Sequence, residues 1–219
     1  MMGSYGASKD VRWTVATGRD YRGMTAEQRL ADRRQRLLHA AYTLFAGAGF
    51  TTTTIERLCA AARISNRAFY ECFSGREDLM RAVYDHCVEE TMLAVSKAIG
   101  EAPPDPDSRI EAGITEYISF VTRDVRRARI MHLEVRRAGE ILSMRRQRAV
   151  TGFTEIIEDA VGELPVGLPG RKHLLALGMV GALQELLIEW VLAERQPPWS
   201  ISSRPPCISS GARSAPEPA

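Results

Sequence analysis

The sequence predicts an all-α protein, and three observations support that fold class. Apolar residues recur at helical spacing through most of the chain between residues 25 and 195. Residue types that cap helices precede these stripes, and glycines or prolines follow them. No segment shows the sustained alternation of apolar and polar residues that indicates a half-buried β-strand. At 219 residues, the chain is long enough to bury a substantial core.

The first part of the chain predicts three helices. A capping box, TAEQ (25–28), opens the first helix, which ends at the glycines of GAG (47–49). A second helix opens with TTIE and covers about 53–61. After a very short turn, the segment RISNRAFYECF (63–73) forms a third helix, which is too short to be stable alone. Two short helices joined by such a turn match the helix-turn-helix geometry, whose second helix enters the major groove of DNA.

The rest of the chain predicts longer helices separated by proline- or glycine-containing breaks. The expected order is a long helix opened by SGRE (74–77) and running to about Ile99, a break (101–107), a helix capped by SRIE (108–111), an arginine-rich helical region (126–148) continuing to Val161, a loop (163–170) and an apolar helix (171–195).

These elements divide into four predicted segments. Residues 1–23 form a flexible N-terminal extension, and 24–74 form a helix-turn-helix DNA-binding domain. Residues 75–195 form a helical ligand-binding and dimerisation domain. Residues 196–219 are rich in proline, serine and glycine and predict a disordered tail.

Charge, hydropathy and cysteine spacing narrow the class of protein. The net charge of +2 neither demands nor excludes a polyanionic partner, so any case for DNA depends on local placement of charge. The most apolar stretch contains Gln184, Glu185 and Glu189, which favours a buried helix over a membrane span. No secretory signal is visible, and the four cysteines form no CxxC pair. We therefore expect a cytoplasmic protein with no membrane partner.

No residue pattern predicts catalysis. The sequence has no glycine-rich phosphate loop, no nucleophile elbow and no paired acids, so we expect no enzyme and no catalytic residues. His132 and Glu134 form an isolated H-x-E without a third ligand at suitable spacing, which predicts no metal site. No cofactor is implied.

The segment from RRQRLLHAAYTLF to MRAVYDHC (33–87) resembles the N-terminal domain of the tetracycline-repressor (TetR) family. The resemblance rests on the AA..LF stretch, the G-F and T-T pairs, the Ile–Ser turn, the aromatic-rich helix ending in Phe73 and the Arg–Glu pair that follows it. It covers about 29–87, and the region 108–195 looks like the family's ligand-binding and dimerisation domain. Transferred position by position, it implies DNA contacts by Thr52, Thr53, Arg63, Ser65, Asn66, Arg67, Ala68, Tyr70 and Arg76.

The implied roles differ along this set. Hydroxyls at the start of the second helix would hold phosphate, and Ser65 would cap the third helix. Asn66, Arg67 and Ala68 would face bases, while Tyr70 and Arg76 would contact the DNA backbone. The simpler interpretation of Asn66 and Arg67 is solvated helix surface, and a half-buried core tyrosine would give the same pattern as Tyr70. Phe69 and Phe73 are expected to pack in the core.

Four positions depart from the family pattern. Arg63 stands where the family usually has glycine, and Arg67 stands where a small residue is common. If residue 63 is left-handed, the arginine costs roughly 1–2 kcal/mol. Cys72 replaces a residue type that often contacts phosphate, and Glu71 brings negative charge near DNA. Our hypothesis is that Arg63 and Arg67 add cationic reach that offsets both departures.

The resemblance also implies a homodimer on a near-palindromic operator, formed through the helix 171–195. A repressor released by a lipophilic small molecule is the expected function. The candidate ligand contacts are inward-facing residues of the long helices, which core packing would also predict: Tyr84, Met92, Tyr117, Phe120, Met131 and Gln184. Two alternatives remain open: an architectural DNA-binding protein of the same fold, or a helical small-molecule-binding protein that has lost DNA binding.

Overall fold

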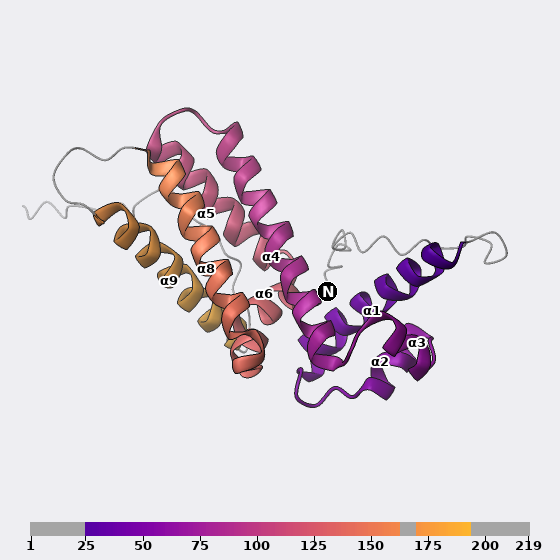
Figure 1. Cartoon of the computed structure of the whole chain (residues 1–219). Helices are drawn as coiled ribbons and strands as arrows, with labels where there is room; N and C mark the ends of the chain where they lie inside the picture. Colours follow the sequence, from indigo (N-terminus) through magenta and orange to yellow (C-terminus); the bar gives the residue numbers. More distant parts are fainter. Residues whose placement is uncertain (1–24, 163–169, 194–219) are drawn as a thin grey trace, which may run out of the picture.

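The computed structural model describes residues 25–162 and 170–193, and every regular element in those residues is a helix (Figure 1). The elements are α1 (Ala26–Ala48), α2 (Ile55–Ala62), α3 (Asn66–Cys72), α4 (Arg76–Glu101), α5 (Pro106–Thr122), α6 (Val125–Ala128), the π-helix η2 (Arg129–Glu134), α7 (Val135–Arg137), α8 (Glu140–Val161) and α9 (Arg171–Leu192). The predicted all-α fold class is confirmed. The predicted extension (1–23), the tail (196–219) and residues 163–169 of the predicted loop lie outside the described residues.

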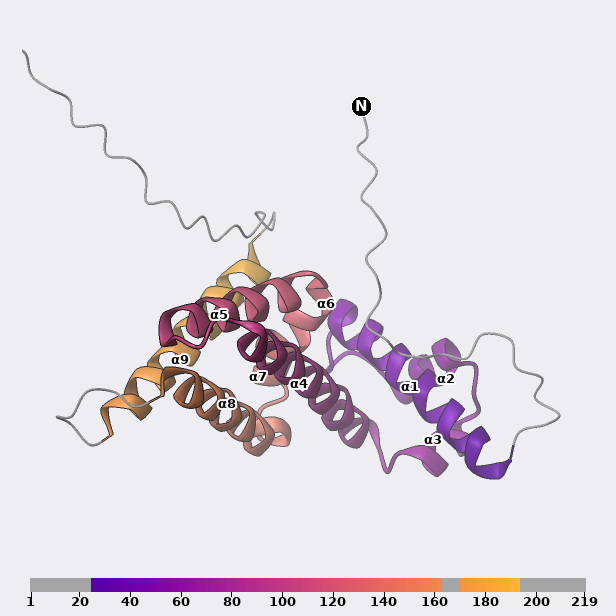
Figure 2. The same ribbon diagram turned by 90° about the horizontal axis from the view of Figure 1, so that it is seen from above.

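The helices form a small head at one end and a larger helical body at the other (Figures 1 and 2). Helices α1, α2 and α3 make the head. Helix α4 begins at the head and runs into the body, where α5 and α8 pack against it and α9 packs on α8. Buried apolar side chains form one continuous core that extends from Leu37 in α1 to Val191 in α9. The head and the body therefore share a core rather than being joined by a loose linker.

Helix α1 begins as the sequence predicts. The Thr25 hydroxyl accepts a hydrogen bond from the Gln28 backbone N–H at 3.2 Å, and the Gln28 side chain accepts one from the Thr25 N–H at 2.9 Å. Together these bonds make the predicted capping box. Tyr42 and Phe45 are fully buried on the inner face of the helix and anchor it in the core. Gly49 ends the helix with a φ of 94°, which only glycine adopts readily.

The predicted start of α2 is wrong by one threonine. The helix begins at Ile55, and its cap is Thr54, whose hydroxyl accepts from the Arg57 N–H at 3.3 Å. Thr53 is not available as a cap because its own hydroxyl is buried and donates to the Gly49 carbonyl at 2.7 Å. Four consecutive threonines make the two positions indistinguishable by residue type alone.

Two further predicted caps are corrected. Helix α4 follows Gly75 without a side-chain cap, and the Ser74 N–H donates to the Asp78 carboxylate at 3.1 Å. Helix α5 is capped by Asp105, which accepts from the Ser108 N–H at 2.9 Å, so Ser108 lies inside the helix rather than before it. The proline that directly follows Asp105 suits the first helical position, where no N–H is needed.

The arginine-rich region is not one continuous helix. It divides into α6, the π-helix η2 and α7, and a break at Gly139 separates α7 from α8. Gly139 has a φ of 59° and a ψ of −131°, a conformation that favours glycine. Within the wider turn of the π-helix, the polar residues His132 and Glu134 are buried together with their apolar neighbours.

The turn between α2 and α3 contains a strained residue. Arg63 has a φ of 54° and a ψ of 50°, so it is left-handed although it is not glycine. Its N–H donates to the Ala60 carbonyl at 3.2 Å, which closes the end of α2. The sequence predicted a cost for arginine if residue 63 is left-handed, and the structure meets that condition. The turn has a conformation that favours glycine, yet it carries an arginine side chain.

We predict that Arg63→Gly stabilises the protein by about 1 kcal/mol, because glycine relieves the left-handed strain but adds freedom to the unfolded chain. Thermal unfolding should shift upward by about 2–4 °C. Arg63→Ala is the control, since it removes the same charge but keeps the strain. An equal upward shift in both variants would assign the effect to charge instead.

Candidate DNA-binding surface and effector cavity

Helix α3 combines a capped start with a buried inner face. The Ser65 hydroxyl accepts from the Ala68 N–H at 3.2 Å, as the predicted cap requires. Phe69 and Phe73 are buried in the core, which agrees with their predicted packing role. A helix of seven residues is thus held by its neighbours, and its outer face is available for polar residues.

The outer face of α3 and its preceding turn carries most of the predicted DNA contacts. Arg63, Ser65, Asn66, Arg67 and Tyr70 are all exposed. The side chain of Arg67 is 91% exposed. Tyr70 is 59% exposed, so it is not the half-buried core tyrosine of the alternative interpretation. These five predicted contacts are therefore accessible on α3 and the turn that precedes it.

Two predicted DNA contacts lie on the inner side instead. Thr53 is 0% exposed and its hydroxyl is bonded to Gly49, so this hydroxyl cannot hold phosphate. Ala68 is buried, so its methyl group does not face bases. Thr52 is exposed, although its hydroxyl donates to the Ala48 carbonyl at 2.6 Å. The exposed cap residue Thr54 occupies the position at the start of α2 that the sequence assigned to Thr53.

Arg76 has a structural role that the sequence did not predict. Its Nη1 donates to the backbone carbonyls of Thr53 at 2.8 Å and Thr51 at 3.3 Å. Its guanidinium also lies 4.6 Å from the centre of the Phe50 ring. These contacts fix the loop between α1 and α2 against the start of α4. They also occupy part of the Arg76 guanidinium, which was expected to contact phosphate.

Arginines of α1 brace the ends of α2 and α3. Arg34 donates to the Cys72 carbonyl at 3.0 Å and lies 4.2 Å from the centre of the Phe73 ring. Arg36 donates to the Ala62 carbonyl at 3.4 Å. Carbonyls at the C-terminal ends of helices lack partners within the helix and carry partial negative charge, so cations are well placed there. Sequence periodicity could have placed these arginines on the polar face of α1, but not against these carbonyls.

A third α1 arginine contacts α3 through a carboxylate. Arg33 Nη1 lies 2.7 Å from one oxygen of Glu71, and Arg67 Nε lies 3.5 Å from the other oxygen. Glu71 is therefore an ion-pair partner of two arginines rather than an isolated negative charge near DNA.

The head is joined to the body by hydrogen bonds to two acidic side chains. The Tyr42 hydroxyl donates to Asp124 at 3.0 Å, and the Phe50 N–H donates to Glu134 at 2.9 Å. Arg129 completes the joint by donating to the carbonyl of Ala46 at 2.7 Å. These bonds connect the C-terminal end of α1 with α6 and the π-helix, across more than eighty residues of sequence.

Both carboxylates of the joint are buried and paired. Glu134 is 1% exposed and lies 2.9 Å from Arg137. Burial would raise the pKa of Asp124, but hydrogen bonds from Arg126 and Tyr42 outweigh it and hold this pKa below its usual value. A buried carboxylate that loses a partner is costly, so the joint favours one arrangement of head and body.

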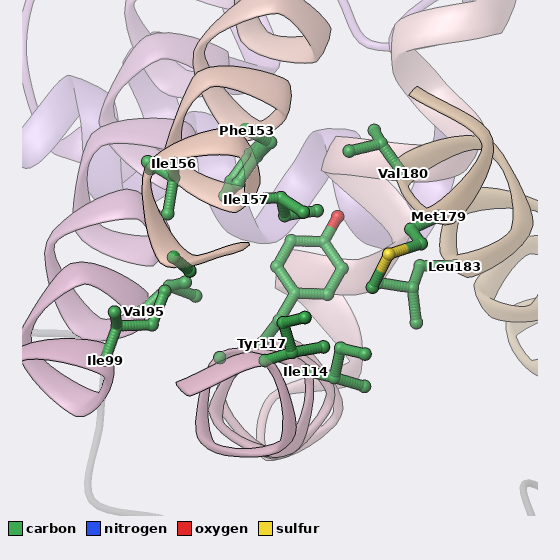
Figure 3. A pocket seen from close by; sticks show the side chains of 13 residues that line it. Val95, Ile99, Ile114, Tyr117, Phe153, Ile156, Ile157, Met179, Val180 and Leu183 are labelled. Carbon is green, nitrogen blue, oxygen red and sulfur yellow. The ribbon is translucent and has the colours of Figure 1, made fainter. Parts of the chain in front are cut away.

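The body contains an apolar cavity between α4, α5, α8 and α9 (Figure 3). Its free volume is about 30 Å³, and the cavity is partly open to solvent. It is lined by Val95, Ile99, Ile110, Gly113, Ile114, Tyr117, Phe153, Ile156, Ile157, Ala160, Met179, Val180 and Leu183. Tyr117 lies near the middle of these side chains, and its hydroxyl is their only polar group. Burial raises the pKa of Tyr117, so the hydroxyl stays protonated.

The predicted ligand contacts only partly coincide with this cavity. Tyr117 lines it, whereas Tyr84 and Met131 are buried elsewhere in the core. Met92 and Gln184 are half-buried and do not line it. Phe120 lies against two arginines, with the Arg127 guanidinium 4.0 Å and the Arg123 guanidinium 5.6 Å from its ring centre.

Helix α9 exposes much of its apolar surface. Leu174, Leu175, Leu177, Leu186 and Leu192 are all exposed, while other residues of the same helix pack into the core. The helix is also long and apolar enough, by length and composition alone, to cross a membrane. It packs against α8 and the π-helix within the body.

Comparison with known proteins agrees with this architecture. A helix-turn-helix head on a helical body with an apolar cavity defines a DNA-binding, ligand-binding transcription regulator. Residues 37–83 match the family model described as bacterial regulatory proteins, tetR family. The matched residues place the DNA-binding head of this chain among the TetR-family regulators.

Relatives of known identity are distant. The HTH-type transcriptional activator FasR of Mycolicibacterium smegmatis is 24% identical over 168 residues, which are 75% of this chain and 74% of FasR. The fatty acid degradation regulator FadR from Bacillus halodurans has a TM-score of 0.64 at 16% identity, covering 73% of this chain and 84% of that chain. FadR from Bacillus subtilis, solved in complex with stearoyl-CoA, has a TM-score of 0.62 at 20% identity, covering 71% of this chain and 86% of that chain. At these identities, the structural matches show the shared fold.

We predict that His132 makes the protein sensitive to acid. Burial of the ring, with a smaller effect from Arg136, lowers the pKa of His132 to about 3. The unfolded chain binds this proton near pH 6.5 and the folded chain does not, so stability falls as the pH drops below about 6.5. Between pH 7.5 and pH 5.0 the loss from this group is about 2 kcal/mol.

The measurement is the difference in unfolding free energy between these two pH values for the wild type and for His132→Phe. The variant should lose about 2 kcal/mol less than the wild type on acidification. The same loss in the wild type and His132→Phe would contradict the assignment.

Proposed function

We propose that this protein is a homodimeric repressor that binds a near-palindromic operator and is released by an acyl-type lipophilic ligand. The observation that carries the proposal is that two features occur on parts of the protein that share one continuous core. A polar face containing Asn66, Arg67 and Tyr70 lies on the outside of α3, and an apolar cavity lies in the body. Such a regulator would act in the cytoplasm, where its DNA is.

On DNA, α3 would enter the major groove with its N-terminal residues toward the bases. Arg67 prefers the O6 and N7 atoms of guanine, and Asn66 prefers the N6 and N7 atoms of adenine. Thr52, Ser65 and Tyr70 would contact the DNA backbone from positions around this helix. Arg63 extends from the turn and would add a cation near phosphate.

The exposed leucines of α9 support the proposed dimer. A helix with apolar residues on a face that the body does not cover has unburied surface that a second copy would bury. A two-fold axis through this face would place two recognition helices on successive half-sites, which explains the expectation of a palindrome. Glu185 and Glu189 interrupt the apolar sequence of α9, which favours a protein partner over a lipid one.

The cavity favours a ligand with a long apolar part. It offers apolar carbon and sulfur surface on every side and a single hydroxyl, that of Tyr117. A charged group inside it would be desolvated without a partner, so a headgroup would remain at the mouth. The similar fold of FadR from Bacillus subtilis was solved with stearoyl-CoA, which has this division into an acyl chain and a polar head.

The π-helix offers a physical link between cavity and head. The Tyr117 hydroxyl lies 3.5 Å from Nε2 of His132, and Glu134 of the same π-helix accepts from the Phe50 N–H at the head. A ligand that displaces Tyr117 would change the support of this segment. To regulate, it must bind the arrangement that cannot hold DNA more tightly than the one that can.

An activator is the second candidate function, because the relative FasR is named a transcriptional activator. The two functions share the same DNA-binding head. They differ in the effect on transcription from a promoter that carries the selected operator: the repressor lowers it and the activator raises it.

We predict that selection from random duplex DNA recovers a short palindrome bound by the wild-type protein. Arg67→Ala should weaken binding to that palindrome by roughly 5- to 150-fold, because a bidentate base contact contributes about 1–3 kcal/mol. The measurement is a titration of fluorescent duplex at several salt concentrations. If Arg67→Ala changes neither the affinity nor its salt dependence, the hypothesis that Arg67 provides cationic reach is wrong. A shallow preference without a palindrome would support the architectural alternative.

We predict that long-chain acyl-CoA binds the body and releases the operator. Ile99→Trp fills the cavity and should weaken acyl-CoA binding by at least about tenfold, which is about 1.4 kcal/mol. Leu93→Trp on the same helix is the control, because Leu93 is exposed and does not line the cavity. Calorimetry measures binding, and DNA titration measures release. Equal weakening in both variants would place the ligand elsewhere.

A further inference from the structure

The carboxylate of Glu71 lies between two arginines of different helices. Arg33 comes from α1 and lies 2.7 Å from one carboxylate oxygen, while Arg67 lies one turn before Glu71 on α3 and is 3.5 Å from the other oxygen. The exposed fractions of the three side chains increase outward, from 27% for Arg33 to 43% for Glu71 and 91% for Arg67. The three residues therefore form a row that begins on the head and ends at the face proposed to contact DNA.

The atoms involved decide what this row can do. Glu71 faces the Nε of Arg67, which is the nitrogen nearest the side chain's stem. The two terminal nitrogens form the other edge of the planar guanidinium, and that edge matches the O6 and N7 atoms of guanine. An arginine whose Nε is paired with a carboxylate can thus present its terminal edge to a base with less loss of side-chain freedom on binding.

Arg33 explains why Glu71 can serve this purpose. An unpaired carboxylate on a recognition helix would repel phosphate and could swing toward other cations. The short contact with Arg33 holds one oxygen of Glu71 and compensates its charge, so the row of three carries a net charge of +1. The other oxygen remains directed at Arg67.

We infer that Glu71, held by Arg33, is a positioning residue that orients Arg67 for recognition of a guanine in each operator half-site. This inference rests on the proposed DNA-binding function and specifies the base class that Arg67 selects. It reverses the role that the sequence suggested for Glu71, from a charge that must be offset to one that supports specific recognition.

The test compares two effects of Glu71→Ala, on the affinity for any duplex and on the discrimination between bases. If Glu71 acts only as a negative charge, Glu71→Ala tightens binding to every duplex, specific or not. If Glu71 positions Arg67, the same variant tightens binding to unrelated DNA but loses discrimination at one base pair. The base pair is identified with Arg67→Ala, as the position in the selected operator where this variant no longer distinguishes the bases, and it should be a G·C pair.

At that base pair, the wild type should prefer guanine by about tenfold or more. Glu71→Ala should reduce the preference by at least about threefold, and Arg33→Ala should reduce it in the same direction. In the Arg67→Ala background, adding Glu71→Ala should change it no further. Glu56→Gln is the matched control, because Glu56 is an exposed acid of α2 that is bonded at the start of its own helix. It should preserve the preference.

Two results would overturn the inference. It fails if the base pair sensitive to Arg67 contains no guanine, and it fails if Glu71→Ala leaves discrimination at that base pair intact. Thermal unfolding of each variant distinguishes a local effect from loss of the fold. If the wild type selects no DNA sequence at all, the proposed function fails, which is a separate outcome from the loss of this inference.

Discussion

The arrangement of head and body depends on two carboxylates buried at their junction. Glu134 accepts from the backbone of Phe50, and Asp124 accepts from the hydroxyl of Tyr42. A buried carboxylate that loses its partners is left with a large desolvation penalty, so each must remain hydrogen-bonded or the segment that carries it must move. The junction therefore favours one arrangement of head and body, and it determines where α3 lies relative to the cavity.

The π-helix gives this junction its connection with the body's interior. Its wider turn brings consecutive residues inward, so that His132 lies against Tyr117 while Glu134 reaches the head. Burial keeps His132 neutral, which means that its contact with Tyr117 is not an ion pair and involves no strong electrostatic attraction. The contact of the π-helix on the cavity side is thus weaker than its contact with the head, as the proposed displacement by a ligand requires.

Local features could be predicted from the sequence and long-range ones could not. The capping box at 25–28 was predicted correctly because its two bonds join residues three apart. The choice between Thr53 and Thr54 depended on which hydroxyl the loop buries, and residue type does not reveal that. Of the predicted ligand contacts, Tyr117 lines the cavity. Periodicity predicts which residues face inward, but it does not distinguish a residue that meets a cavity from one in a packed core. The role of Glu134 requires the π-helix and the head together, and no local pattern encodes either.

Arginine content alone would misjudge how this head meets DNA. Arg34 and Arg76 are engaged with backbone carbonyls and aromatic rings, so their presence in the sequence does not translate directly into phosphate contacts. Their bonds stabilise the ends of short helices that could not persist alone. Arg67 is the contrasting case, because its Nε faces the Glu71 carboxylate while 91% of its side chain is exposed. The arginines of this head thus form two groups: some stabilise the helices of the head, and others extend from its surface. The net charge of +2 does not indicate the size of either group.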